Sequence, residues 1–142
     1  MPKIYVPIAL QKAVVARAKG YCEYCQLPAS FSPASFNFEH IMPLIKQGVT
    51  TAENLAFSCG GCNAYKRDKT EALDPLTRQL SALFNPRTAI WSDHFEWNDD
   101  DLQIIGSTPV GRATVQLLKV NREGNINLRR LLKMAGLHPP VF

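Results

Sequence analysis

Apolar positions alternate along the chain between helical and strand-like spacing, and they begin with a helix followed by two strands. Residues 8–19 are rich in Ala, Lys and Arg, and Gly20 suits the end of a helix. Residues 36–41 and 55–58 are typical of short strands separated by a turn. A second helix is predicted over residues 62–70. The first half therefore predicts a helix, a hairpin and a further helix.

The second half predicts three helices and a second hairpin. An Asp-Pro start and apolar side chains recurring every three or four residues predict a helix over residues 74–84. Residues 89–97 and 102–105 predict a hairpin around an acidic, solvated turn. The remaining helices are expected over residues 109–120 and 125–135. Altogether, five helices and two hairpins predict a mixed α+β fold.

Composition restricts the class of protein. The chain has 142 residues, of which 46% are hydrophobic and 20% charged, so a disordered chain is excluded. The length suits one domain, or one domain with a modest annex. No apolar run has the length of a membrane span. Residues 1–7 lack the features of a signal peptide, which predicts a cytoplasmic protein. The net charge of +4 permits a nucleic-acid partner without demanding one.

The four cysteines form two Cys-x-x-Cys pairs, Cys22 with Cys25 and Cys59 with Cys62, separated by 33 residues. Two such pairs complete a tetrahedral zinc site. The glycines between Cys59 and Cys62 leave room for backbone amides that turn toward the sulfurs. A redox pair or buried hydrophobic thiols are the alternatives. Two pairs in a short cytosolic chain favour structural zinc, and four sulfur ligands leave that zinc no open position for catalysis.

The segment between and just after the cysteine pairs carries a potential base and oxygen ligands. Glu39 and His40 stand near the end of a predicted strand, and Asn63 opens the next helix. Adjacent strand residues point to opposite faces, so Glu39 and His40 converge only where the strand ends or bends. Lys66 and Arg67 follow Asn63 on the same helical face. A base, a metal with oxygen ligands and two cations on one surface predict a phosphodiester site.

These motifs follow one another in a characteristic order: Cys-Glu-Tyr-Cys at 22–25, Phe-Glu-His-Ile-Met-Pro at 38–43, Gly48, Asn54-Leu55, and Cys59 through Cys62-Asn63 to Lys66. Over residues 17–70 the chain resembles the HNH endonuclease family, and residues 83–115 resemble the C-terminal part of its bacterial stand-alone members. The resemblance implies a ββα-metal core with a four-cysteine zinc site in residues 1–72. Residues 73–142 would form a C-terminal annex, a hairpin and helices packed on that core.

The resemblance also implies roles for four residues. His40 matches the general base that activates water. Glu39 matches the first ligand of a catalytic divalent cation, a position usually occupied by Asp, and Asn63 matches the second ligand. Asn54 matches the central Asn that braces the loop between the strands and so orients His40. Mg²⁺ suits oxygen ligands best, and Mn²⁺, Ni²⁺ or Zn²⁺ can support cleavage in such sites.

Other polar residues have less specific interpretations. Lys66 and Arg67 are predicted phosphate contacts, although exposed helices often carry such pairs. His94 lies between two tryptophans and is expected to pack on the annex rather than bind a metal, and His138 is expected in solvent. The annex either binds DNA through its arginines or merely covers the core; the candidates are Arg112, Arg122, Arg129 and Arg130.

The leading hypothesis is a metal-dependent endonuclease that cuts or nicks DNA and, as the resemblance to the HNH family implies, leaves a 5′-phosphate. One alternative is a non-catalytic zinc module that binds nucleic acid or protein, and another is a nuclease acting on RNA. The zinc module requires the cysteines but not Glu39, His40 and Asn63 together, so their joint presence favours the enzyme. The sequence specificity and the choice between monomer and homodimer are not indicated by the sequence.

Overall fold

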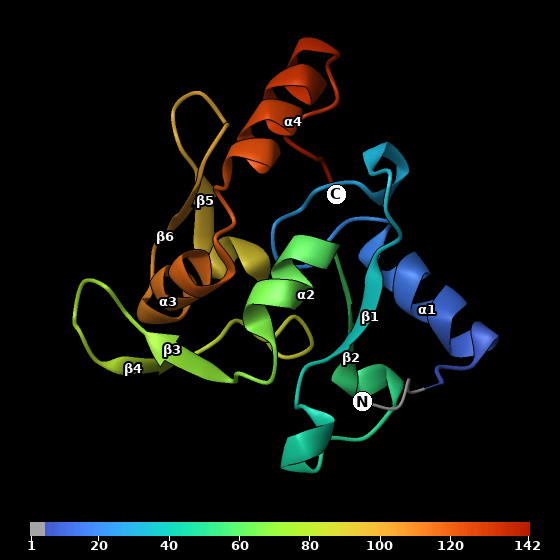
Figure 1. Ribbon diagram of the computed structural model, residues 1–142. Coiled ribbons are helices and arrows are strands. Elements are labelled where there is room, and N and C mark those ends of the chain that lie inside the picture. The colour runs from blue at the N-terminus through green and yellow to red at the C-terminus, as the bar shows by residue number, and fades with distance from the viewer. Residues whose placement is uncertain (1–4) are drawn as a thin grey trace.

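The structure, a computed structural model, describes residues 5–142 (Figure 1). Within this range it has four α-helices and three two-stranded antiparallel hairpins, which confirms the α+β class but differs from the five helices and two hairpins expected. The order is α1 (Ile8–Ala18), β1 (Asn37–His40), β2 (Leu55–Ser58), α2 (Gly60–Lys66), β3 (Glu71–Leu73), β4 (Leu80–Ala82), β5 (Phe95–Trp97), β6 (Ile104–Gly106), α3 (Pro109–Leu118) and α4 (Glu123–Met134).

The first hairpin and the helix after it form a ββα unit. β1 pairs antiparallel with β2, with His40 opposite Leu55 at the end of the ladder. α2 begins directly after β2 and contacts β1. Both strands were predicted from the sequence, and α2 ends at Lys66, before the expected Thr70. The short α2 and the strand end at His40 bring the predicted site residues close together in space.

α1 packs against β2 and covers one side of the hairpin. The helix ends where the sequence predicts: Lys19 and Gly20 have φ values of 56° and 79°, the left-handed conformation that glycine adopts without strain. Val14, Leu55 and Phe57 form the centre of this small core. A second core cluster surrounds the cysteines and extends into the annex.

The helix predicted over residues 74–84 is wrong. β3 and β4 form a hairpin there; Leu76 and Leu80 are 71% and 67% exposed, whereas Leu83 and Phe84 are buried, so the four side chains do not form one apolar helical face. Asp74 stabilises the turn instead, because its carboxylate accepts hydrogen bonds from Leu76 N and Thr77 Oγ1. Arg112 of α3 binds the same carboxylate through two nitrogens, at 2.9 and 3.0 Å. This long-range pair fixes a hairpin where local spacing favours a helix.

The hairpin β5–β6 and the helix α3 lie where the sequence predicts them, although the strand expected over residues 89–97 spans only Phe95–Trp97. Thr108 caps α3 by accepting a hydrogen bond from Gly111 N, and Pro109 occupies the first turn. Gly111 allows α3 to approach the hairpin, since a Cβ there would lie 2.0 Å from the carbonyl oxygen of His94. α3 also contacts α2 and the β3–β4 hairpin, so it joins the annex to the ββα unit (Figure 1).

α4 lies at one end of the molecule, at the top of Figure 1, and is fastened by buried polar contacts. Arg129 is fully buried and donates to the carbonyls of Val120 and Leu102 at 2.7 and 3.0 Å. The expectation of a solvent-exposed His138 is wrong, because the ring is buried against Trp97 and Nε2 lies 2.7 Å from the carbonyl oxygen of Asp101. His138 is therefore packed into the annex, while the ring of Phe142, at the end of the chain, packs against Tyr21 just after α1.

The predicted DNA contacts of the annex are largely replaced by internal ones. Arg112 binds Asp74, Arg122 contacts cysteine sulfurs, and Arg129 is buried, which leaves Arg130 as the exposed member of the four. None of the helices in the described part of the chain has the length and apolar character needed to cross a membrane.

Candidate active site and cysteine cluster

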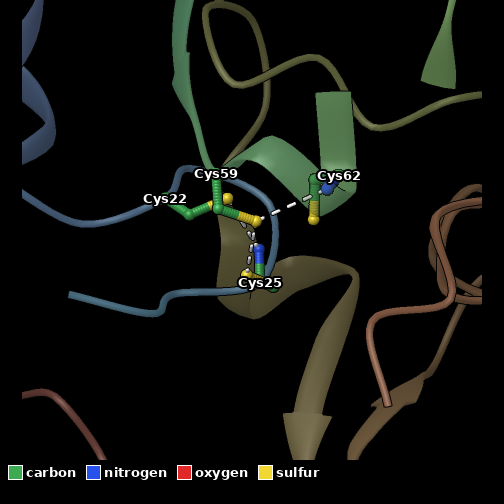
Figure 2. Close-up of side chains that lie close together, drawn as sticks. All are labelled: Cys22, Cys25, Cys59 and Cys62. Carbon is green, nitrogen blue, oxygen red and sulfur yellow. Dashed lines mark hydrogen bonds between the residues drawn. The ribbon is translucent and has the colours of Figure 1, made fainter. Parts of the chain in front are cut away.

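The four cysteines converge on one buried point (Figure 2). Cys22 and Cys25 come from the loop after α1, while Cys59 caps α2 and Cys62 lies in its first turn. All four sulfurs lie within 4.8 Å of one another, and the sulfurs of Cys25 and Cys59 are 3.6 Å apart. Two backbone amides support the sulfurs at 3.4 Å, Cys25 N with Cys22 and Cys62 N with Cys59.

This arrangement fits a zinc ion. Zinc–sulfur bonds of about 2.3 Å in a tetrahedron require sulfurs about 3.8 Å apart, close to the separations present. The donor set is four soft thiols, as structural zinc prefers. Hydrogen bonds with Cys22 and the other cysteines lower the pKa of Cys59 from its ordinary value. The cluster is consistent with a structural zinc site.

Glu39 is buried on β1 with a cation and a hydroxyl. Its Oε1 lies 2.5 Å from Nζ of Lys66, and its Oε2 accepts a 2.7 Å hydrogen bond from Tyr24 Oη. Burial raises the pKa of Glu39, while Lys66 and Tyr24 oppose the shift by stabilising the carboxylate. Lys66 is 2% exposed and also donates to the carbonyl of Ile41 at 3.2 Å. Lys66 therefore forms a buried ion pair with Glu39 and does not occupy the exposed position expected of a phosphate contact.

His40 is partly buried at the end of β1 and is oriented by Thr50. The ring nitrogen Nε2 lies 2.9 Å from Thr50 Oγ1. Burial, together with the nearby charge of Lys66, lowers the pKa of His40 below its ordinary value. The neutral imidazole is therefore favoured near neutral pH, and this is the form able to accept a proton.

Asn54 braces the loop between β1 and β2. Its Oδ1 accepts from Met42 N at 2.8 Å, and its Nδ2 donates to the carbonyls of Met42 and Val49 at 3.0 and 2.8 Å. Gly48 belongs to the same loop, where a Cβ would lie 1.8 Å from the carbonyl oxygen of Met42. The loop that carries Thr50 is thereby held against the end of β1.

One open groove connects the predicted site residues. Glu39, His40, Asn63 and Arg67 all line it, and the remaining wall is largely apolar. β1 supplies Glu39 and His40, while α2 and its C-terminal cap supply Asn63 and Arg67. Glu39 and His40 reach one groove because the strand ends at His40, the condition stated from the sequence. Lys66 lies behind Glu39 and does not line the groove.

Sequence reasoning missed two residues at this site. Tyr24 lies between the cysteines of the first pair and has no role predicted from the sequence, yet its hydroxyl donates a hydrogen bond to Glu39. Thr50 lies in a loop with no motif of its own, so no local signal marks its contact with His40. His94 was expected to pack on the annex, and it does: Nδ1 lies 2.7 Å from Thr108 Oγ1, and the ring contacts Phe84.

Comparison of the sequence with known protein families identifies the same part of the chain. The sequence model of the HNH endonuclease family matches residues 22–69, from the first cysteine to just beyond α2. These residues form an HNH endonuclease domain. HNH nucleases act on nucleic acid, so the match indicates nuclease activity. The matched HNH segment contains all four cysteines and every residue that lines the groove except Val6 and Gln11. No curated protein shows a significant match to the chain.

Proposed function

We propose that this protein is a metal-dependent endonuclease that hydrolyses phosphodiester bonds in DNA. The observation that carries the proposal is the groove of the HNH segment, where Glu39, His40 and Asn63 lie together with the exposed cation of Arg67. A carboxylate, an amide oxygen, a neutral imidazole and a cation are the groups that phosphodiester hydrolysis requires.

His40 is the proposed general base. When the Thr50 hydroxyl accepts a hydrogen bond from Nε2–H of His40, Nδ1 keeps its lone pair and can take a proton. Nδ1 removes the proton of a water molecule whose oxygen attacks phosphorus. As that bond forms, the bond from phosphorus to the 3′ oxygen breaks; the 3′ oxygen takes a proton from solvent and leaves as a 3′-hydroxyl, and the other product is a 5′-phosphate. Asn54 supports this step indirectly, through the loop that holds Thr50.

Glu39 and Asn63 are the proposed ligands of a divalent cation, with Mg²⁺ or Mn²⁺ the best match for oxygen donors. Lys66 and Tyr24 hold the Glu39 carboxylate from within the protein, and each carboxylate oxygen retains a further lone pair for a cation in the groove. Such a cation, when bound, stabilises the negative charge that develops on the phosphate. Arg67 is the proposed phosphate contact, and the four cysteines are the proposed ligands of a structural zinc.

Cleavage of supercoiled plasmid tests the enzyme directly. The zinc-loaded protein should nick or linearise the plasmid with Mg²⁺ or Mn²⁺ and not with excess EDTA. His40→Ala should lower the rate about 10²–10⁴-fold, the usual contribution of a general base. His94→Ala is the matched control, because His94 lies outside the groove. A His40→Ala variant as fast as the parent would exclude this mechanism. RNA of the same sequence, assayed in parallel, decides between DNA and RNA.

One observation favours a second function, a non-catalytic zinc module that binds nucleic acid. Both oxygens of Glu39 already have partners inside the protein, Lys66 and Tyr24. Binding of Mn²⁺, followed by electron paramagnetic resonance, distinguishes the two functions. The endonuclease requires Mn²⁺ binding that weakens in Glu39→Gln. A zinc-loaded protein that binds DNA, takes up no Mn²⁺ and cleaves nothing would be the module.

A further inference from the structure

Arg122 reaches the cysteine cluster from outside the HNH segment. It immediately precedes α4, and its Nη2 donates to the sulfur of Cys59 at 3.2 Å, while Nη1 lies 4.0 Å from the sulfur of Cys62. Nη1 also donates to the carbonyls of Leu118 and Lys119, at 3.2 and 3.1 Å. The guanidinium therefore bridges the C-terminal end of α3 and the two cysteines at the start of α2.

Gly61 provides the space for this bridge. A Cβ at Gly61 would lie 2.3 Å from Nη2 of Arg122, whereas a Cβ at Gly60 would meet no heavy atom within 4 Å. The sequence suggested that both glycines serve the turn of the backbone amides toward sulfur. The structure gives Gly61 a separate reason to be glycine, which is the close approach of Arg122 over the first turn of α2.

Charge explains why an arginine is useful at this position. Four thiolates around one Zn²⁺ carry a net charge of about −2, and all four cysteines here are buried. A buried anion requires hydrogen-bond donors and positive charge nearby. Two backbone amides supply donors, and within residues 5–142 Arg122 is the one charged side chain that donates a hydrogen bond to a cysteine sulfur.

We propose that Arg122 is an outer partner of the zinc centre, which retains the metal and fastens residues 119–134 to the HNH segment. This rests on the proposed structural zinc, and it assigns a function to part of the annex. The zinc centre of the HNH segment is then complete only with a residue that lies well outside the matched range.

Zinc retention in the full-length, zinc-loaded protein tests the proposal. Zinc content is measured by elemental analysis, and zinc release is followed with a chromogenic chelator. Arg122→Gln should weaken zinc binding about 10–100-fold, as is usual when an outer partner of a metal ligand is removed. Arg130→Gln is the matched control, because Arg130 is exposed on α4 and donates to Asn127. Amide hydrogen exchange over residues 119–134 should be faster in Arg122→Gln than in the parent, and unchanged in Arg130→Gln.

A second pair of variants keeps the test decisive if Arg122→Gln does not fold. Gly61→Ala displaces the guanidinium and leaves its charge, so it should release zinc faster than the parent, while Gly60→Ala should not. Parental release rates in both Arg122→Gln and Gly61→Ala would overturn the role of Arg122 and leave the zinc site standing. A parent protein that folds without zinc would overturn the zinc site and this role together.

Discussion

Nζ of Lys66 lies 2.5 Å from Oε1 of Glu39, and both side chains are almost completely buried. Removing one partner of a buried pair leaves the other charge without compensation. Lys66→Met should therefore lower the free energy of unfolding by about 3–5 kcal/mol, as measured by urea denaturation. Lys69→Met, at an exposed position three residues later, should change it by less than about 0.5 kcal/mol. Equal effects of the two substitutions would contradict a buried pair.

Asn54 makes three hydrogen bonds that hold the loop after β1. Asn54→Ala should cost about 1.5–4.5 kcal/mol of stability, because each of the three bonds contributes roughly 0.5–1.5 kcal/mol. Displacement of the loop should also slow plasmid cleavage, by about 10²-fold for a shift near 1 Å. Asn54→Asp keeps the acceptor for Met42 N and should fall in between. Asn127→Ala, on the exposed surface of α4, should leave the cleavage rate unchanged.

Gly48 approaches the backbone of Met42 too closely for any side chain. Gly48→Ala should therefore destabilise the protein and slow cleavage, since the loop must move to accommodate the Cβ. Gly124→Ala is the control: a Cβ there meets nothing within 4 Å, and alanine favours the helix by about 0.5–1 kcal/mol. Thermal unfolding should show a lower midpoint for Gly48→Ala and an equal or higher one for Gly124→Ala.

The pKa of His40 is lowered from its ordinary value, first by burial and then by Lys66. A general base acts only when unprotonated, so activity is lost as the pH falls through its pKa. We expect kcat/KM for cleavage to rise with pH and to level off above a midpoint below about 6.5, the ordinary value for histidine. Nuclear magnetic resonance titration of His40, assigned with His40→Ala, should give the same midpoint. A midpoint at or above the ordinary value would contradict the burial of this ring.

The ββα unit was predictable because its signals are local. The strand pattern, the glycine-containing loop and the Cys-x-x-Cys pair of α2 all lie within a few residues of the elements that they specify. The same holds for α3, where Thr108 and Pro109 mark the start directly. The strand predicted over residues 36–41 also placed Glu39 and His40 correctly near the end of β1.

The errors arose where distant residues decide the structure. The Asp74-Pro75 pair is a valid helix start, and only the contact with Arg112, 38 residues later, reveals that Asp74 holds a turn instead. Lys66 resembles any exposed helical cation until the tertiary fold brings it to Glu39. Arg122 and Arg129 likewise resemble DNA contacts in the sequence, although the structure gives both of them internal partners.

The position of Arg122 in the chain has a consequence for synthesis of the protein. Cys62 precedes Arg122 by 60 residues, so both cysteine pairs leave the ribosome before their cationic partner. At about 5–20 residues per second, this separation corresponds to roughly 3–12 s. On the proposed role of Arg122, a metal ion bound to the nascent chain during that interval lacks this partner and exchanges more readily with its surroundings. Folding of the C-terminal segment then places Arg122 against the cysteine sulfurs, which on the same proposal slows the exchange.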